Sequence, residues 1–166
     1  MKTADNIPKG KGGAFLLLHN IRSAQNVGAI FRTAEAAGIS KVYLSGYTPA
    51  PLDRFGRIRA DVAKAALGAE KLLLWESVSS AGVFVKKMRK EGVYTVALEQ
   101  GRKAVDYRSL RPPLPVLFIL GNEVRGVPPS LQRACDAVAE IPLYGKKESL
   151  NVSVAAGVAL FRILHQ

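Results

Sequence analysis

Cysteine is almost absent from this sequence. Cys135 is the only one in 166 residues, so the chain can form no internal disulfide and no cysteine-based metal cluster. Such a chain suits a reducing compartment, and we expect a cytoplasmic protein without a metal. Hydrophobic runs are also short, and none approaches the roughly 18 apolar residues that span a bilayer. The first 13 residues are polar and rich in Gly and Lys, without the apolar core of a signal peptide.

Acidic residues are scarce relative to basic ones. The chain has 13 Asp and Glu against 24 Lys and Arg, which gives a formal net charge of +11. This surplus favours a polyanionic partner such as nucleic acid over a basic surface that serves only solubility. With 48% hydrophobic and 22% charged residues, the composition is typical of a folded globular protein. We predict a flexible basic arm over residues 1–13 and one domain over residues 14–166.

Common nucleotide-binding fingerprints are missing as well. No GxGxxG follows the first apolar run, no acidic residue ends the second run at Leu44, and no GxxxxGK[ST] occurs. These absences disfavour a Rossmann dehydrogenase and a phosphate-loop NTPase. His19 and His165 lie far apart without metal-ligand spacing, and we interpret both as structural.

Short apolar runs alternate with helical patterns along the chain. The predicted strands, most of them continuous apolar runs typical of strands covered on both faces, are 14–18, 41–44, 71–75, 94–98, 116–120 and 137–141. The predicted helices are 26–37, 77 or 79 to 91, 130–134 and 151–164. This alternation predicts an α/β fold, a mainly parallel sheet with helices on both faces. Residues 45–59 and 99–115 are predicted as long loops, which in compact domains are usually functional or mobile.

Glycines follow three predicted strands in the C-terminal half. Leu98 leads to Gly101, Leu120 to Gly121, and residue 141 to a glycine at 145. Ligands of open α/β sheets gather beyond the carboxyl ends of the strands, and glycine allows the backbone to approach a ligand. The three loops predict either a pocket lined by backbone or three ordinary turns.

The first predicted helix presents two different faces. Arg32 lies one turn from Gly28 among small residues, which leaves room for a ligand or another chain; pairing with Glu35 is the alternative. Asn26 stands at the expected N-cap position. The other face is apolar and should pack on the sheet, through Val27, Ile30, Phe31 and Ala34.

The last predicted helix, 151–164, is apolar almost all round. A helix of this kind must be covered on most sides. A subunit interface provides that cover easily, so we expect a dimer.

Three ordered motifs connect these pieces. They are NIRSAQNVGAIFRTA at 20–34, LGNEVRGV at 120–127, and IPLYG with ESLNVSVA at 141–145 and 148–155. Together they resemble the SpoU/TrmH family of the SPOUT methyltransferase superfamily, over most of the chain from about Leu18 to Leu164. The segment 64–70 is also similar to the family.

The resemblance implies properties that the pattern alone does not. It implies a C-terminal deep trefoil knot, S-adenosylmethionine bound bent between the second and third motif loops, and a homodimer whose sites take residues from both subunits. The implied reaction is methyl transfer to a ribose 2′-hydroxyl of RNA. Many relatives add an RNA-binding domain, whereas only the short arm precedes the domain here. The domain itself would then bind tRNA or rRNA, with the compact dimer favouring tRNA.

Site residues are carried over from the motifs. Arg32 would activate the hydroxyl as a base, hold a phosphate or stabilise the alkoxide, since an arginine pKa above about 12 makes it an unusual base. Glu123 would orient Arg32. Asn26 and Ser149 would position ribose and phosphate, and Asn151 would shape the site at the start of the last helix.

Two further sets complete the predicted site. The cofactor-binding set comprises Leu98, Glu99, Gly101, Leu120, Gly121, Asn122, Ile141, Leu143, Ser149 and Leu150; Leu143 stands where relatives often have Met. The RNA-binding set comprises Arg22, Arg54, Arg57, Arg59, Lys9 and Lys11.

Three alternatives remain at this point. One is a non-catalytic RNA-binding protein that keeps the fold, and another is a SPOUT enzyme that methylates a base nitrogen. The third is a small-molecule α/β enzyme, which the net charge and the missing fingerprints disfavour.

Overall fold

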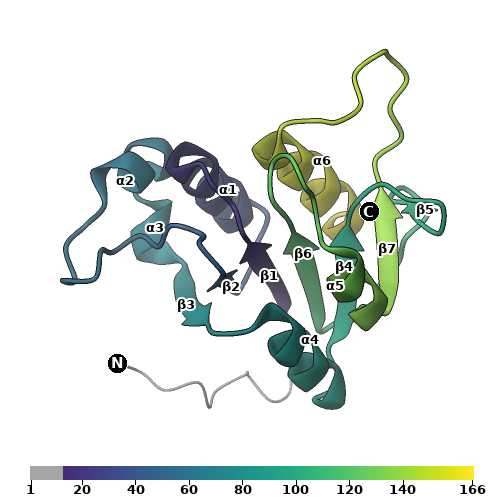
Figure 1. Cartoon of the computed structure of the whole chain (residues 1–166), viewed down its shortest axis with the longest axis horizontal. Coiled ribbons are helices and arrows are strands. Elements are labelled where there is room, and N and C mark those ends of the chain that lie inside the picture. Colours follow the sequence, from purple (N-terminus) through teal and green to yellow (C-terminus); the bar gives the residue numbers. More distant parts are fainter. Residues whose placement is uncertain (1–12) are drawn as a thin grey trace.

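The computed structural model describes residues 13–166, which form one sheet of seven parallel strands in the order β3-β2-β1-β6-β4-β7-β5 (Figure 1). All pairings in this sheet are parallel. The strands are β1 (Ala14–His19), β2 (Lys41–Ser45), β3 (Leu74–Val78), β4 (Tyr94–Leu98), β5 (Val105–Asp106), β6 (Val116–Leu120) and β7 (Ala137–Glu140).

Helices cover both faces of this sheet, as the strand composition predicts. On one face α1 (Ala24–Ala36), α2 (Ala60–Ala66), α3 (Ala69–Leu72) and α6 (Val152–Leu164) bury one core cluster. On the other face α4 (Ala81–Lys90) and α5 (Pro129–Ala134) bury a second cluster. Successive residues of β1 alternate between the clusters, because strand side chains point to opposite faces: Leu16 and Leu18 join the first, Phe15 and Leu17 the second. The parallel α/β class is therefore confirmed.

The first helix packs closely on α2 because of a glycine. A Cβ atom placed on Gly28 would lie 2.3 Å from the carbonyl oxygen of Val62 and 2.8 Å from Cβ of Ala65. The small residue at position 28 therefore serves contact between helices of the same chain. The prediction that Gly28 leaves room beside Arg32 for a ligand or another chain is therefore wrong, because α2 occupies the space next to Gly28.

The predicted strand 71–75 begins about three residues too early. Residues 69–72 form α3, and β3 begins only at Leu74. A short continuous apolar run such as Leu72–Leu74 has no periodicity that separates helix from strand. The helix α2 was not predicted, and the predicted loop 99–115 contains the short strand β5.

Helix starts also differ from the sequence prediction. Ser23, not Asn26, caps α1, and its hydroxyl accepts a hydrogen bond from the backbone N–H of Asn26. Ser80 caps α4, one or three residues later than expected. Asn151 caps α6 through its side-chain oxygen, as its position before the apolar run predicts.

Candidate active site

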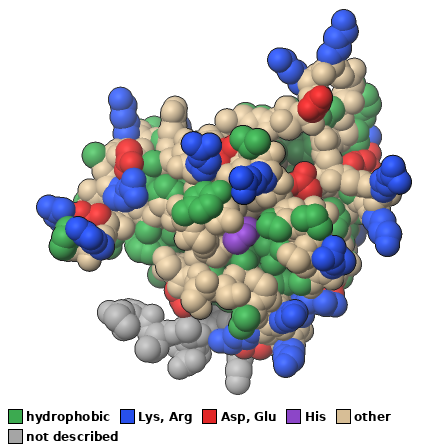
Figure 2. Space-filling model, viewed as in Figure 1, with side chains coloured by type: hydrophobic (Ala, Val, Ile, Leu, Met, Phe, Trp, Pro, Cys, Tyr) green, Lys and Arg blue, Asp and Glu red, His purple; other side chains and the backbone are tan. Residues whose placement is uncertain are grey.

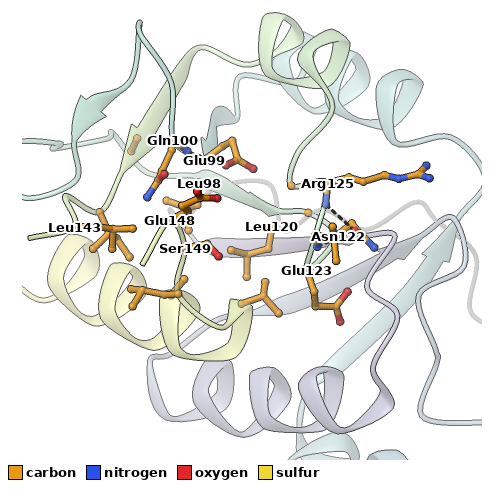
Figure 3. A pocket seen from close by; sticks show the side chains of 18 residues that line it. Leu98, Glu99, Gln100, Leu120, Asn122, Glu123, Arg125, Leu143, Glu148 and Ser149 are labelled. Carbon is orange, nitrogen blue, oxygen red and sulfur yellow. Dashed lines mark hydrogen bonds between the residues drawn. The ribbon is translucent and has the colours of Figure 1, made fainter. Parts of the chain in front are cut away.

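A pocket of about 290 Å³ opens beyond the carboxyl ends of β4, β6 and β7 (Figure 3). Three loops and the first turns of α6 form its walls. Nine of the ten predicted cofactor-binding residues line it, and Gly101 does not. The nine are Leu98, Glu99, Leu120, Gly121, Asn122, Ile141, Leu143, Ser149 and Leu150. The glycine-bearing loops therefore do form a common pocket, as one of the two interpretations held.

The loop after β6 folds tightly back on itself at the pocket wall. A Cβ atom on Gly121 would lie 2.3 Å from the carbonyl carbon and oxygen of Gly126 and 2.4 Å from the nitrogen of Val127. Asn122 and Gly126 form an antiparallel bridge across the turn. The carboxylate of Glu99 accepts the Val127 N–H at 2.8 Å and so joins this loop to the end of β4. Gly121 is thus required by contacts within the loop.

Glu123 connects the second motif to the first. Its carboxylate accepts backbone N–H groups of Arg22 at 2.9 Å and Ser23 at 3.0 Å, and the Asn26 side-chain amide at 3.1 Å. These donors surround the N-terminus of α1, where the helix dipole favours a negative charge. Burial raises the pKa of Glu123, but these hydrogen bonds outweigh it and hold that pKa below its ordinary value.

Asn26 in turn joins the third motif. The side-chain nitrogen of Asn151 donates to the Asn26 oxygen at 3.2 Å, while the Asn151 oxygen caps α6 by accepting the Ser153 N–H at 2.8 Å. A continuous chain of hydrogen bonds therefore runs from Glu123 through Asn26 to Asn151. We call these three residues the motif junction. It brings together positions 97 and 125 residues apart in the sequence.

A second network behind the pocket was missed by sequence reasoning. The Asn122 side chain donates to the Asn20 carbonyl oxygen at 3.0 Å and to the Tyr47 hydroxyl at 3.1 Å. His19 lies beside it, with Nδ1 2.8 Å from the Ser45 hydroxyl. Burial lowers the pKa of His19. This placement supports the structural interpretation of His19, and His165 likewise contacts a backbone carbonyl, that of residue 37.

Arg32 stands apart from the motif junction. Its residue is exposed on α1, and within residues 13–166 the structure shows it no hydrogen bond or ion pair, with Glu123 or with Glu35. The prediction that Glu123 orients Arg32 is therefore wrong within one chain, because the carboxylate is occupied by the start of α1 two turns away. Neighbouring Thr33 faces α6, 3.6 Å from where a Cβ of Gly157 would lie.

Other pocket residues were not predicted. Gln100, Val124, Arg125 and Glu148 also line the cavity. In Figure 3 the Glu148 side chain lies close to Ser149 and Leu143, whereas that of Arg125 points away from the pocket. Glu148 could have been found from its place directly before Ser149 in the third motif.

The predicted RNA-binding residues fall into different settings. Arg57 is paired with Asp53 at 2.9 Å, and Arg59 with Asp61 at 2.7 Å. Arg22 and Arg54 are exposed. Lys9 and Lys11 lie outside the described residues.

The whole-chain comparisons agree with the site. Residues 13–161 match the SpoU rRNA Methylase family. This chain belongs to that family. The SpoU motifs at 20–34, 120–127 and 141–155 are thus the ones that the structure brings together around the pocket and the motif junction.

Similar SpoU proteins include an uncharacterized tRNA/rRNA methyltransferase of Archaeoglobus fulgidus, 36% identical over 93% of this chain and 66% of that protein. The 23S rRNA (guanosine-2′-O-)-methyltransferase RlmB of Pseudomonas aeruginosa is 32% identical over 91% of this chain and 58% of its own length. The crystal structure of the AdoMet-bound rRNA methyltransferase from Sinorhizobium meliloti superposes with a TM-score of 0.83 at 32% identity, over 93% of this chain and 56% of that one. The chain thus spans about three fifths of such relatives.

Two classes of feature are not seen in the described part of the chain. None of its helices has the length and apolar character needed to cross a bilayer. Among residues 13–166, no three His, Cys, Asp or Glu side chains gather as metal ligands would.

Proposed function

We propose that this protein transfers a methyl group from S-adenosylmethionine to a ribose 2′-hydroxyl of RNA. The observation that supports this most is the motif junction, which holds Glu123, Asn26 and Asn151 together directly beside the pocket. Two SpoU relatives, from P. aeruginosa and S. meliloti, are named for guanosine-2′-O methylation and for bound AdoMet. Each matches more than nine tenths of this chain, 91% and 93% respectively.

The pocket suits the proposed cofactor. Its volume of about 290 Å³ is near the lower end of the range for small-molecule sites, and its walls combine apolar and polar groups as such sites do. Leu98, Ile141 and Leu143 provide apolar surface for an adenine ring. The carboxylates of Glu99 and Glu148 give the cavity a negative character that suits a sulfonium and an ammonium group. The bound cofactor supplies the electrophilic methyl group.

We propose that the active protein is a dimer in which Arg32 reaches the site of the other copy. The exposed side of α6 carries Val154, Val158 and Phe161, which residues 13–166 leave 51%, 37% and 44% exposed. A second copy would bury these side chains. Arg32 lies on α1, which packs against α6, so the same contact would bring the guanidinium to the partner surface.

In this arrangement the roles of the residues follow from their chemistry. A 2′-hydroxyl is a poor nucleophile until its proton leaves, and this proton would pass to solvent water as the methyl group moves from sulfur to oxygen. A guanidinium that stays charged would stabilise the developing alkoxide or hold the adjacent phosphate. Asn26 and Asn151 would fix the ribose from the motif junction, and Ser149 would contact it from the pocket wall.

The test is a transfer assay with labelled S-adenosylmethionine and total RNA, followed by nuclease digestion and identification of the nucleosides. Wild-type protein should yield 2′-O-methylated nucleosides, and Arg32→Ala should abolish transfer while largely sparing cofactor binding. Arg133→Ala on α5, also exposed and on the other face of the sheet, serves as the charge-matched control. Label on a base nitrogen, or no uptake of the cofactor, would overturn the proposal.

We propose in addition that the C-terminal part is knotted, as the resemblance to SPOUT proteins implies. The support is topological: β6 lies between β1 and β4, and after β7 at the far side the chain returns in α6 to pack on α1. An experimental structure whose chain opens when both ends are pulled would contradict this.

The RNA class is the finer part of the proposal. Named relatives include both tRNA/rRNA and 23S rRNA enzymes, and tRNA stays our prediction. Separated tRNA and rRNA fractions in the same assay decide between them.

A further inference from the structure

The loop between β2 and α2 presents an exposed phenylalanine between two arginines. Phe55 is 66% exposed. The guanidinium carbon of Arg54 lies 4.7 Å from its ring centroid, and that of Arg57 lies 5.0 Å away. We call residues 52–58 the Phe55 loop. In Figure 1 it is part of the segment that extends farthest to the left, and Figure 2 shows basic and hydrophobic side chains together at that end.

The Phe55 loop is built as a firm turn. Leu52 and Ile58 pair in an antiparallel bridge at its base. One Asp53 oxygen accepts the backbone N–H groups of Phe55 at 2.8 Å and Arg57 at 2.9 Å, and the other accepts the Arg57 side-chain Nε at 2.9 Å. The hydrogen bonds of the turn therefore hold the Phe55 ring outward. Because the ring is largely exposed, it contributes little to the stability of the fold.

The two arginines differ in how they are held. Arg57 is fixed by its ion pair with Asp53. Arg54 makes no hydrogen bond or ion pair within residues 13–166, and its guanidinium lies over the Phe55 ring. A flat ligand can therefore take the ring surface that Arg54 covers, while Arg54 moves to a nearby negative charge.

Unpaired nucleotides of RNA have the matching chemistry. Their bases stack on aromatic rings and on guanidinium planes, and their phosphates attract arginine. The connection that carries the Phe55 loop starts at the carboxyl end of β2, which is parallel to β1 and β6, so this connection leaves the same edge of the sheet as the pocket loops. An RNA that reaches the pocket can pass this edge.

We propose that the Phe55 loop is a stacking platform for an unpaired nucleotide of the substrate RNA, outside the nucleotide that is methylated. Phe55 stacks the base, Arg57 stays as the fixed support, and Arg54 binds the phosphate. This proposal rests on the proposed RNA methyltransferase function and adds Phe55 to the residues that recognise RNA.

The test measures fluorescence anisotropy of a labelled oligoadenylate of about 12 nucleotides, within the site sizes of single-strand binders, and of an abasic ribose-phosphate strand of equal length. Phe55→Leu keeps an apolar side chain but removes the ring. It should weaken oligoadenylate binding roughly fivefold to 150-fold, the range for one base–aromatic stack, and leave abasic binding unchanged. Phe55→Trp should restore it. Val83→Ala, at a similarly exposed position on α4, should change neither.

Salt dependence separates stacking from charge. Phe55→Leu should leave the slope of log affinity against log salt unchanged. Arg54→Gln should reduce the magnitude of that slope by about 1, the value for one lost phosphate contact. Equal affinity of Phe55→Leu and wild type for oligoadenylate would overturn the proposal. The proposal would also be overturned if Phe55→Leu lowered the affinity for the abasic strand as much as the affinity for oligoadenylate.

Two further outcomes identify which proposal fails. If wild type methylates RNA but Phe55→Leu binds and turns over normally, only the stacking platform is refuted. If wild type binds S-adenosylmethionine but no RNA strand, both proposals are refuted. Gel filtration of Phe55→Leu should match wild type, and a shift to monomer would assign the loop to an interface between copies instead.

Discussion

Replacing Gly121 by alanine tests whether the loop after β6 must close on itself. The added Cβ would lie 2.3 Å from the Gly126 carbonyl carbon and oxygen, whereas real Cβ atoms essentially never come within 3.0 Å of such neighbours. The two loop segments would have to separate by about 0.7 Å. Because the opposing atoms are backbone, no rotation of a side chain relieves the clash.

The expected cost lies at the upper end of the range for overpacking, about 2–3 kcal/mol of unfolding free energy. For a chain of 166 residues this corresponds to a fall in Tm of roughly 5–10 °C. Separation of the loop would also displace Asn122 and widen the pocket, so affinity for S-adenosylmethionine should fall as well.

The assay is thermal unfolding followed by circular dichroism, with titration calorimetry for the cofactor, at one protein concentration for all variants. Gly101→Ala is the matched control. That glycine follows β4, yet a Cβ there meets nothing within 4 Å, so its Tm should equal or slightly exceed that of wild type. A Gly121→Ala protein with wild-type Tm and cofactor affinity would refute the reasoning about loop closure.

Two further predictions concern the motif junction. Glu123→Gln removes one of the two oxygens that accept the Arg22 N–H, and it removes the negative charge that strengthens the other hydrogen bonds. The free energy of unfolding, measured in urea near neutral pH, should therefore fall by about 1–3 kcal/mol. Because the folded pKa of Glu123 is lowered, its stabilisation is present above the ordinary pKa and is lost as pH falls through the folded pKa; the two proteins should therefore converge in acid, and a constant gap would contradict the assignment. Asn151→Ser keeps an N-cap acceptor for α6 but loses the Asn26 contact, so stability should stay within about 0.5 kcal/mol while methyl transfer drops, and full activity would exclude Asn151 from the site.

Much of the sheet could be predicted because most strands are short, fully apolar runs. Runs such as Ala14–Leu18 and Val116–Leu120 are as long as buried strands, about 4–8 residues, and shorter than the roughly 10–12 residues of a buried helix, so their length favours strands. The helix α3 could not be distinguished from a strand, because Leu72 and Leu73 continue into β3 without any periodicity. The cap of α1 was misplaced because Ser23 and Asn26 are both good capping residues, and only the backbone geometry decides between them.

The pocket was predictable because glycines after parallel strands meet at one edge of the sheet. The role of Glu123 was not. Its partner set consists mostly of backbone N–H groups of Arg22 and Ser23, and such donors leave no signature in the side chains. The network of His19, Tyr47 and Asn122 escaped for a similar reason, since it links the end of β1 with single residues from the loops after β2 and β6.

The place of β6 has a consequence for how the chain acquires its structure. Strands β1 to β3 are joined to β4, β7 and β5 only through β6, whose Val116 pairs with Ala14, about a hundred residues earlier. During synthesis the first three strands must therefore wait, with one edge of β1 unpaired, until residue 120 has emerged. Such distant pairing slows folding and exposes an edge to aggregation. We expect nascent chains to depend on protection by chaperones until the central strand is inserted.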